Sequence, residues 1–307
     1  MSPLSNVPVT ILTALDLLLE PYFLFLIIRK STPGMEVIQF FLVVISLSNM
    51  AFSVLIFITS PVLFFSGHNL IIQSPTLSPV SGFVFWHLAI FFFIIQLQFS
   101  LLMLLYASHK ITNPINGLDL KSAWIWISGL VFVLTPALAY VGCNSLALET
   151  FESFDYAPDG PGLGVLIYFC VYHMIYGTLA AVAIVRILRV TRGPSVQVSP
   201  DTVKLIHTVL RNFIISTNIV FVFDTIPIVL AVVTSLLQMF EFSSIVFGIG
   251  TKLISVYVPI STLASIFIFA PYREFTLGMV KKLVTRKTEV AEIKIVSGTS
   301  SSGSGNK

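Results

Sequence analysis

Residues 83–107 read FVFWHLAIFFFIIQLQFSLLMLLYA, a run without Asp, Glu, Lys or Arg. One helix needs about 20 predominantly apolar residues to cross a bilayer, so this run is long enough to span a membrane. The rest of the chain has the same character, because 56% of its 307 residues are hydrophobic and 10% are charged. Soluble domains carry about 25% charged residues. The sequence therefore predicts an integral membrane protein without a large domain outside the bilayer.

Further apolar runs precede and follow this one, each bounded by polar or turn residues. In chain order, the predicted spans cover residues 8–28, 38–64, 83–107, 123–142, 163–189, 209–237 and 247–270. Pro21 interrupts the first span, and we expect the helix to bend there. The predicted fold class is an all-α membrane protein, a seven-transmembrane helix bundle.

The distribution of Lys and Arg predicts how the bundle is oriented. Basic residues close to the ends of spans stay on the cytoplasmic side of a membrane. If the N-terminus lies outside, every basic residue except Lys252 falls on the inner side. We therefore expect an N-terminus outside the cell and a cytoplasmic C-terminus.

Composition and charge divide the chain into three parts. Residues 1–271 contain the predicted bundle. Residues 272–290 combine one apolar stripe with basic residues, which is typical of an amphipathic helix on the membrane surface. Residues 291–307 are rich in Ser and Gly, and we expect a disordered cytoplasmic tail.

Three carboxylates fall within predicted spans, where ionisable groups are costly and often functional. Asp16 and Glu20 are four residues apart and share one helix face. The pair is either a proton or cation site or a set of hydrogen-bond acceptors for neighbouring helices. Asp224 precedes Pro227, which should kink its helix. Asp224 is either a ligand contact or pivot, or a buried structural residue.

Polar and aromatic side chains in the third and fifth spans allow two interpretations as well. Tyr168, Tyr172 and Tyr176 recur every four residues on one helix face, as in either packing or the lining of a pocket. His87 and His173 could form a pocket wall or hydrogen-bond within the bundle. No third ligand stands at matching depth with the spacing of a metal site, so we expect no metal.

The motifs of the common catalytic and cofactor sites are absent from this sequence. It contains no Gly-rich phosphate loop, no nucleophile elbow and no His-Glu-x-x-His motif. Two cysteines, Cys143 and Cys170, are too few for a Cys-rich zinc site. No basic run is interleaved with aromatic residues as in nucleic-acid-binding proteins. We therefore expect no enzyme activity, no cofactor and no nucleic-acid partner; the lipid bilayer is the partner that the composition implies.

Two short motifs resemble those of a known receptor family. The first predicted inner loop contains Thr32-Pro33-Gly34-Met35, and the last span ends in Pro271-Tyr272-Arg273. A Thr-Pro-x-Met step after the first helix and a Pro-Tyr-Arg step closing the seventh resemble the nematode serpentine chemoreceptors of the Str superfamily, class H or a related class. The resemblance covers the whole seven-span layout.

This resemblance implies a function that composition alone does not provide. It implies a G-protein-coupled receptor in the plasma membrane, on the ciliary membrane of sensory neurons. Such a receptor detects a small extracellular chemical cue and activates a heterotrimeric G protein. The small-molecule ligand and the G protein are therefore the expected partners.

Within that hypothesis, the ligand lies between the outer halves of the third, fifth, sixth and seventh helices. Its candidate contacts are His87, Gln96, Tyr172, His173, Asp224 and Tyr257. The candidate G-protein contacts are basic residues near the inner ends of helices: Arg186, Arg189, Lys204, Arg211 and Arg273.

Two alternatives come from other functional classes. A proton-coupled transporter could use Asp16, Glu20 and Asp224 as a relay, although the sequence shows no convincing repeat between its halves. A membrane scaffold without a ligand would instead have a bundle filled with apolar side chains.

Overall fold

The computed structural model describes residues 7–32, 34–66, 69–113, 123–151, 153–155, 160, 162–192 and 199–282. Seven helical segments within these ranges are long and apolar enough to cross a membrane, which confirms the predicted fold class. The helices are α1 (Val7–Lys30), α2 (Glu36–Thr59), α3 (Pro79–Thr112), α4 (Ala123–Leu146), α5 (Gly162–Arg192), α6 (Pro200–Val220), the π-helix η2 (Phe221–Thr225), α7 (Ile226–Leu236) and α8 (Phe240–Ile268). The sixth span consists of α6, η2 and the first part of α7.

Several helix boundaries differ from the predicted spans, among them the start of α8 at Phe240 and not near residue 247, and two of the differences have local reasons. α2 ends at Thr59 and not near residue 64, because Ser60 adopts a left-handed conformation with φ of 39° and is followed by Pro61. α6 begins at Pro200 and not near residue 209. The Ser199 hydroxyl accepts the backbone N–H of Thr202 at 3.3 Å and so caps the helix. The first turns of α6 are polar, so the apolar composition of the sequence did not predict them.

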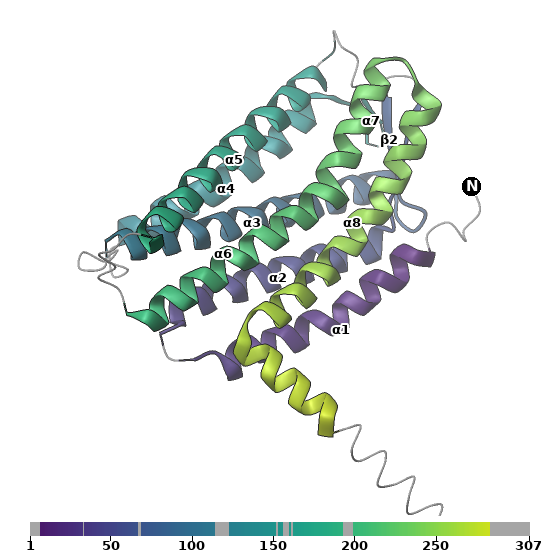
Figure 1. Cartoon of the computed structure of the whole chain (residues 1–307). Coiled ribbons are helices and arrows are strands. Elements are labelled where there is room, and N and C mark those ends of the chain that lie inside the picture. Colours follow the sequence, from purple (N-terminus) through teal and green to yellow (C-terminus); the bar gives the residue numbers. More distant parts are fainter. Residues whose placement is uncertain are drawn as a thin grey trace, which may run out of the picture.

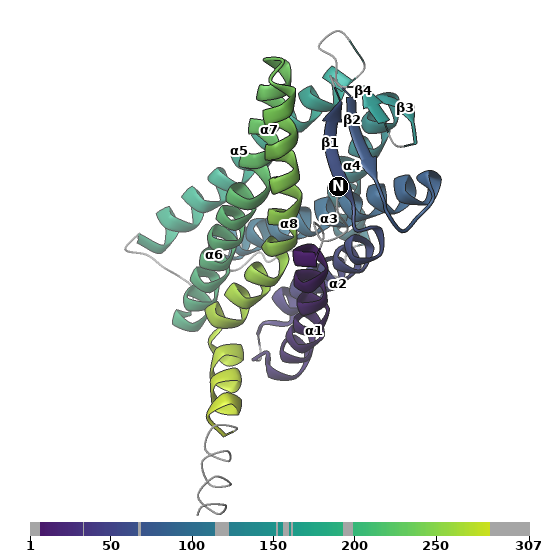
Figure 2. The same ribbon diagram turned by 90° about the vertical axis from the view of Figure 1, so that its right-hand side faces the viewer.

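One end of the bundle carries a four-stranded antiparallel sheet that the sequence analysis did not predict. Its strands are β1 (Val62–Ser66), β2 (Asn69–Gln73), β3 (Leu148–Thr150) and β4 (Ser153–Asp155), in the order β1-β2-β4-β3. Figure 2 shows this sheet above the end of α4. Leu70 in β2 pairs with both Phe65 and Phe154. We call this end of the molecule the sheet end.

The opposite end of the bundle collects the basic residues that close α1, α3 and α5 and open α6. We call it the basic end and define it by Arg29, Lys110, Arg189 and Lys204. The charge asymmetry behind the predicted orientation is therefore a feature of the folded bundle. The orientation itself stays a prediction.

The core runs the length of the bundle between helices that are distant in sequence. α1 lies beside α8, and α3 passes between α2 and the α5–α6 side (Figure 1). Toward the basic end, Leu26, Leu42 and Leu104 are almost completely buried in one apolar cluster. Toward the sheet end, a second cluster joins Phe52 of α2 to Phe154 of β4. The sheet therefore extends the core of the bundle.

A helical segment of residues 270–282 follows α8 after a break at Phe269. Its first turns contact α1, since the hydroxyls of Tyr22 and Thr276 are hydrogen-bonded at 2.8 Å. The hydroxyls of Ser31 and Tyr272 are bonded at 2.8 Å as well. Burial raises the pKa of the Tyr272 phenol. The predicted surface helix is described up to residue 282; its remainder and the predicted tail lie outside the described residues.

Candidate functional site

A cluster of polar side chains joins α1, α2 and α8 inside the bundle. Asp16 and Glu20 are 0% and 1% exposed. Both are surrounded by hydroxyl and amide groups from the other helices. We call this group the carboxylate cluster: Asp16, Glu20, Ser46, Asn49, Ser53 and Thr262.

Each carboxylate of this cluster accepts hydrogen bonds from another helix. Glu20 accepts the hydroxyls of Ser46 and Thr262 and, at 2.9 Å, the amide N–H of Asn49. Asp16 accepts the Ser53 hydroxyl at 2.5 Å. The donors of α2 are spaced by three and four residues, so they share one helix face. These bonds agree with the hypothesis that both carboxylates are acceptors for neighbouring helices.

A second polar group lies between α3, α5, η2 and α8. The amide N–H of Gln96 donates to the hydroxyl of Tyr257 at 2.8 Å, and that of Gln98 donates to Tyr172 at 3.0 Å. Asp224 of η2 is within electrostatic range of both tyrosines. We call these residues the tyrosine cluster: Gln96, Gln98, Tyr172, Asp224 and Tyr257.

The backbone around Asp224 departs from α-helical geometry. The N–H of Ile226 donates to the carbonyl of Phe221, five residues earlier, as in a π-helix. Pro227 follows directly and has no N–H to continue the α-helical pattern. We predicted a kink at Pro227, and the structure has a π-turn just before it. Such turns are frequent at functional sites.

The carboxylate of Asp224 is itself unusual. Asp224 is 4% exposed, and it accepts no hydrogen bond from any residue in the described ranges. Its surroundings are phenols: Tyr140, Tyr172 and Tyr257. Burying a carboxylate without a hydrogen-bond donor is costly, so this position is suited to receive one from outside the chain.

Of the two histidines predicted as ligand contacts, His173 lies at the edge of the tyrosine cluster and His87 lies outside it. His173 touches Tyr172, with ring centroids 5.2 Å apart, and its Nδ1 is bonded to the carbonyl of Phe169 at 2.8 Å. His87 lies under the sheet, where Asn144 donates to its Nε2 at 2.7 Å. The structure thus brings together Gln96, Tyr172, Asp224 and Tyr257 and places His87 elsewhere.

Several members of the two clusters were missed by the sequence analysis. Gln98 had a visible signal, because glutamine is rare in a run as apolar as residues 83–107. Thr262 had none. Its position in the last helix gave no indication that it bonds Glu20 in the first.

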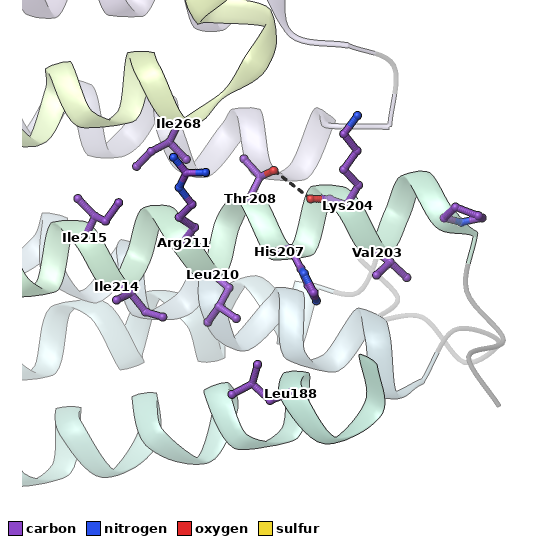
Figure 3. A pocket seen from close by; sticks show the side chains of 11 residues that line it. Leu188, Val203, Lys204, His207, Thr208, Leu210, Arg211, Ile214, Ile215 and Ile268 are labelled. Carbon is purple, nitrogen blue, oxygen red and sulfur yellow. Dashed lines mark hydrogen bonds between the residues drawn. The ribbon is translucent and has the colours of Figure 1, made fainter. Parts of the chain in front are cut away.

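A groove of about 990 Å³ opens at the basic end between α5, α6 and α8. Figure 3 shows His207 pointing from α6 toward Leu188 of α5, whereas Arg211 points toward Ile268 of α8. Lys204 lies about one turn before His207 on α6. The groove combines an apolar floor with basic groups, which suits a protein surface of mixed apolar and acidic character.

The predicted G-protein contacts fall at or near this groove. Lys204 and Arg211 line it. Arg186 and Arg189 are exposed on α5. Arg273 is half-buried, and its guanidinium donates to the carbonyl of Phe267 at 3.3 Å. The sequence analysis did not single out His207, which also lines the groove.

Comparison with known proteins gives one family. Residues 143–282 match the family described as serpentine type 7TM GPCR chemoreceptor Srh. No curated protein matches the chain. The matched segment includes Tyr172, Asp224 and Tyr257 as well as the groove at the basic end.

This match indicates the functional class of the protein. It is a family of receptors and not of enzymes, and it agrees with the resemblance to class H or a related class that the motifs after the first and last helices carried. The chain is a seven-helix, multi-pass membrane protein whose match over residues 143–282 supports its assignment to the Srh class of serpentine chemoreceptors.

Proposed function

We propose that this protein is a G-protein-coupled chemosensory receptor. It binds a small extracellular chemical cue at the tyrosine cluster and activates a heterotrimeric G protein through the groove at the basic end. The Srh match supports the receptor class. We place the protein in the plasma membrane, in the ciliary membrane of sensory neurons, as the family resemblance implies.

The observation that carries the ligand site is the unpaired Asp224. A ligand that presents a hydrogen-bond donor or a positive charge offsets the cost of burying this carboxylate. The phenols of Tyr172 and Tyr257 supply both apolar ring surface and a polar group for the rest of the ligand. Gln96 fixes the Tyr257 hydroxyl and so sets the shape of that wall.

We propose different roles for the two histidines: His173 contacts the ligand at the rim of the tyrosine cluster, and His87 supports the shape of the pocket. His173 touches Tyr172 and lies at the rim of the cluster. His87 is buried and bonded on both ring nitrogens, to Phe83 and to Asn144. We propose that it holds the sheet end of the pocket in shape.

Coupling requires that ligand binding at the tyrosine cluster changes the conformation of the groove at the basic end. The sixth span connects the two sites directly, because Asp224 lies in its π-turn while Lys204 and Arg211 lie on the α6 part. A ligand that prefers one geometry of the π-turn shifts the population of α6 positions. We propose Lys204, Arg211, Arg186, Arg189 and Arg273 as the G-protein contacts.

The proton-coupled transporter is the second candidate. One observation favours it, since Tyr257 lies within electrostatic range of Asp16, Glu20 and Asp224. The test is proton flux in proteoliposomes. Flux that depends on Asp16, and is lost in Asp16→Asn, supports the transporter and contradicts the receptor.

The receptor proposal is tested by ligand-evoked G-protein activation in transfected cells, using a panel of small amines, alcohols and acids. For a compound that activates the wild type, we expect Asp224→Ala and His173→Ala to raise the half-maximal concentration at least about tenfold, which corresponds to 1.4 kcal/mol. Asn218→Ala is the matched control, because Asn218 is exposed on α6 and bonds only its own helix at Ile214. An unchanged response in both variants contradicts the proposed pocket.

A further inference from the structure

The carboxylate cluster surrounds Glu20 with side chains that can donate hydrogen bonds. All three partners of Glu20 are donors: two hydroxyls and one amide N–H. An ionised carboxylate is acceptor-only and can accept about four such bonds, whereas a protonated one must place a proton of its own. All three partners are able to donate to an ionised Glu20, and the two hydroxyls are also able to accept from a protonated one.

No basic side chain in the described part of the chain neutralises this charge. The polar neighbours of Asp16 are Glu20 and Ser53, and those of Glu20 are hydroxyl groups and one amide group. A buried charge without a counter-charge costs several kcal/mol. A carboxylate that ionises in this cluster therefore has no counter-charge from the described side chains.

Two oxygen atoms in the cluster are buried and without a hydrogen-bond partner. One is Oδ1 of Asp16, and the other is Oδ1 of Asn49. Asn49 is 4% exposed and comes from α2, so it is independent of the acidic pair on α1. Its amide nitrogen donates to Glu20 at 2.9 Å, which places the amide group beside that carboxylate, one helical turn from Asp16 along α1.

We infer that α1, α2 and α8 hold a monovalent alkali cation at the carboxylate cluster, with Oδ1 of Asp16 and Oδ1 of Asn49 as ligands. Oxygen atoms are the ligands of hard cations. The ion supplies the positive charge that the surrounding side chains lack. This inference is independent of the proposed receptor function, because it concerns a different group of residues and needs no ligand or G protein.

The number of free oxygens argues for a monovalent ion. Calcium takes six to eight oxygen ligands, and magnesium demands near-ideal octahedral geometry. The cluster offers two oxygens that are free of other partners. The described ranges also contain no group of three or more His, Cys, Asp or Glu side chains that could hold a metal, which argues against a transition metal. A monovalent ion that keeps part of its water fits this donor set.

Radiolabelled sodium, and radiolabelled rubidium as a stand-in for potassium, test the site on the full-length wild-type protein in nanodiscs. We expect saturable binding of one of them that excess unlabelled salt of the same ion displaces and choline does not. A folded wild type that binds neither ion saturably overturns the inference. Because this arm needs no variant, a failure to fold cannot obscure it.

Thermal unfolding locates the site. At constant ionic strength, replacing choline chloride by the chloride salt of the bound ion should raise the Tm of the wild type by about 2–4 °C, the shift expected for about 1 kcal/mol of binding free energy. Asp16→Asn and Asn49→Ala should lose this rise.

Asp224→Asn is the matched control, because it removes a buried carboxylate outside the cluster, and the rise should persist in it. A rise that persists in Asp16→Asn and Asn49→Ala, or that disappears in Asp224→Asn, overturns the assignment to these residues. A wild type that binds the ion but gives no G-protein response to any tested compound contradicts the receptor proposal alone, so the two failures are distinguishable.

Discussion

Two carboxylates within membrane spans of this protein have opposite surroundings. Glu20 of the carboxylate cluster accepts hydrogen bonds from α2 and α8. Asp224 of the tyrosine cluster is buried to a similar degree and accepts none from the described residues. The same chemical group therefore holds helices together in one place and is left available in the other.

The difference follows from the helix geometry around each group. Glu20 lies on α1 directly before Pro21 and faces two helices that carry hydroxyl and amide side chains. Asp224 lies on a π-turn, and its neighbours are tyrosines, of which Tyr172 and Tyr257 already bond glutamines of α3. We therefore expect substitutions at Glu20 to affect stability first and those at Asp224 to affect the ligand response first.

Glu20→Leu has the largest expected effect on stability. It removes the acceptor of three inter-helix hydrogen bonds, at about 0.6 kcal/mol each inside a membrane. We expect the free energy of unfolding to fall by about 2 kcal/mol in denaturant titrations of the micelle-solubilised protein. Asp224→Leu is the control, and its stability should stay equal to that of the wild type or rise. If both variants lose the same free energy of unfolding, Glu20 does not stabilise the bundle more than Asp224 does, and the contrast between the clusters is contradicted.

Tyr257→Phe is expected to have the next largest effect. The change leaves the amide N–H of Gln96 buried without its acceptor, which costs about 1 kcal/mol. Denaturant titration measures the loss, and Tyr172→Phe provides the parallel case for Gln98. If Tyr257→Phe is as stable as the wild type, the bond between α3 and α8 does not support the tyrosine cluster.

Thr262→Val should cost least, about 0.6 kcal/mol, since it removes one hydroxyl donor to Glu20. Thr13→Val is a closely matched control. Thr13 is buried as well, but its hydroxyl bonds the carbonyl of Val9 in its own helix. Thermal melts of both variants should show a larger decrease in Tm for Thr262→Val. A larger decrease for Thr13→Val would mean that packing, and not the bond to Glu20, determines the effect.

The sequence allowed the helices to be predicted because each depends on the composition of one continuous segment. Hydropathy located all seven spans, but α2 ends at Thr59 rather than near residue 64, α6 begins at Pro200 rather than near residue 209, and α8 begins at Phe240 rather than near residue 247. The sheet was missed because residues 62–65 are as apolar as the helix before them. A Pro following Ser60 was the available signal that the helix stops there.

The candidate site was predicted only where its signal was local. Asp16 and Glu20 were recognised as a pair by their spacing, and Asp224 by its depth in a span. Their partners depend on how α1, α2 and α8 are rotated against one another, which a single sequence does not reveal. Other threonines among the described residues bond the backbone of their own helix, as Thr13 and Thr59 do.

The most direct test of the account is complex formation between the purified receptor in nanodiscs and nucleotide-free heterotrimeric G proteins of the Gi/o, Gs and Gq classes. We expect the wild type to co-elute with one class and the double variant Lys204→Glu, Arg211→Glu to lose at least about 90% of the complex, because it reverses the charge of the groove. Lys252→Glu, which reverses an exposed charge on α8 outside the groove, should bind like the wild type. A wild type that binds no heterotrimer, or a double variant that binds as well as the wild type, would contradict coupling through the basic end.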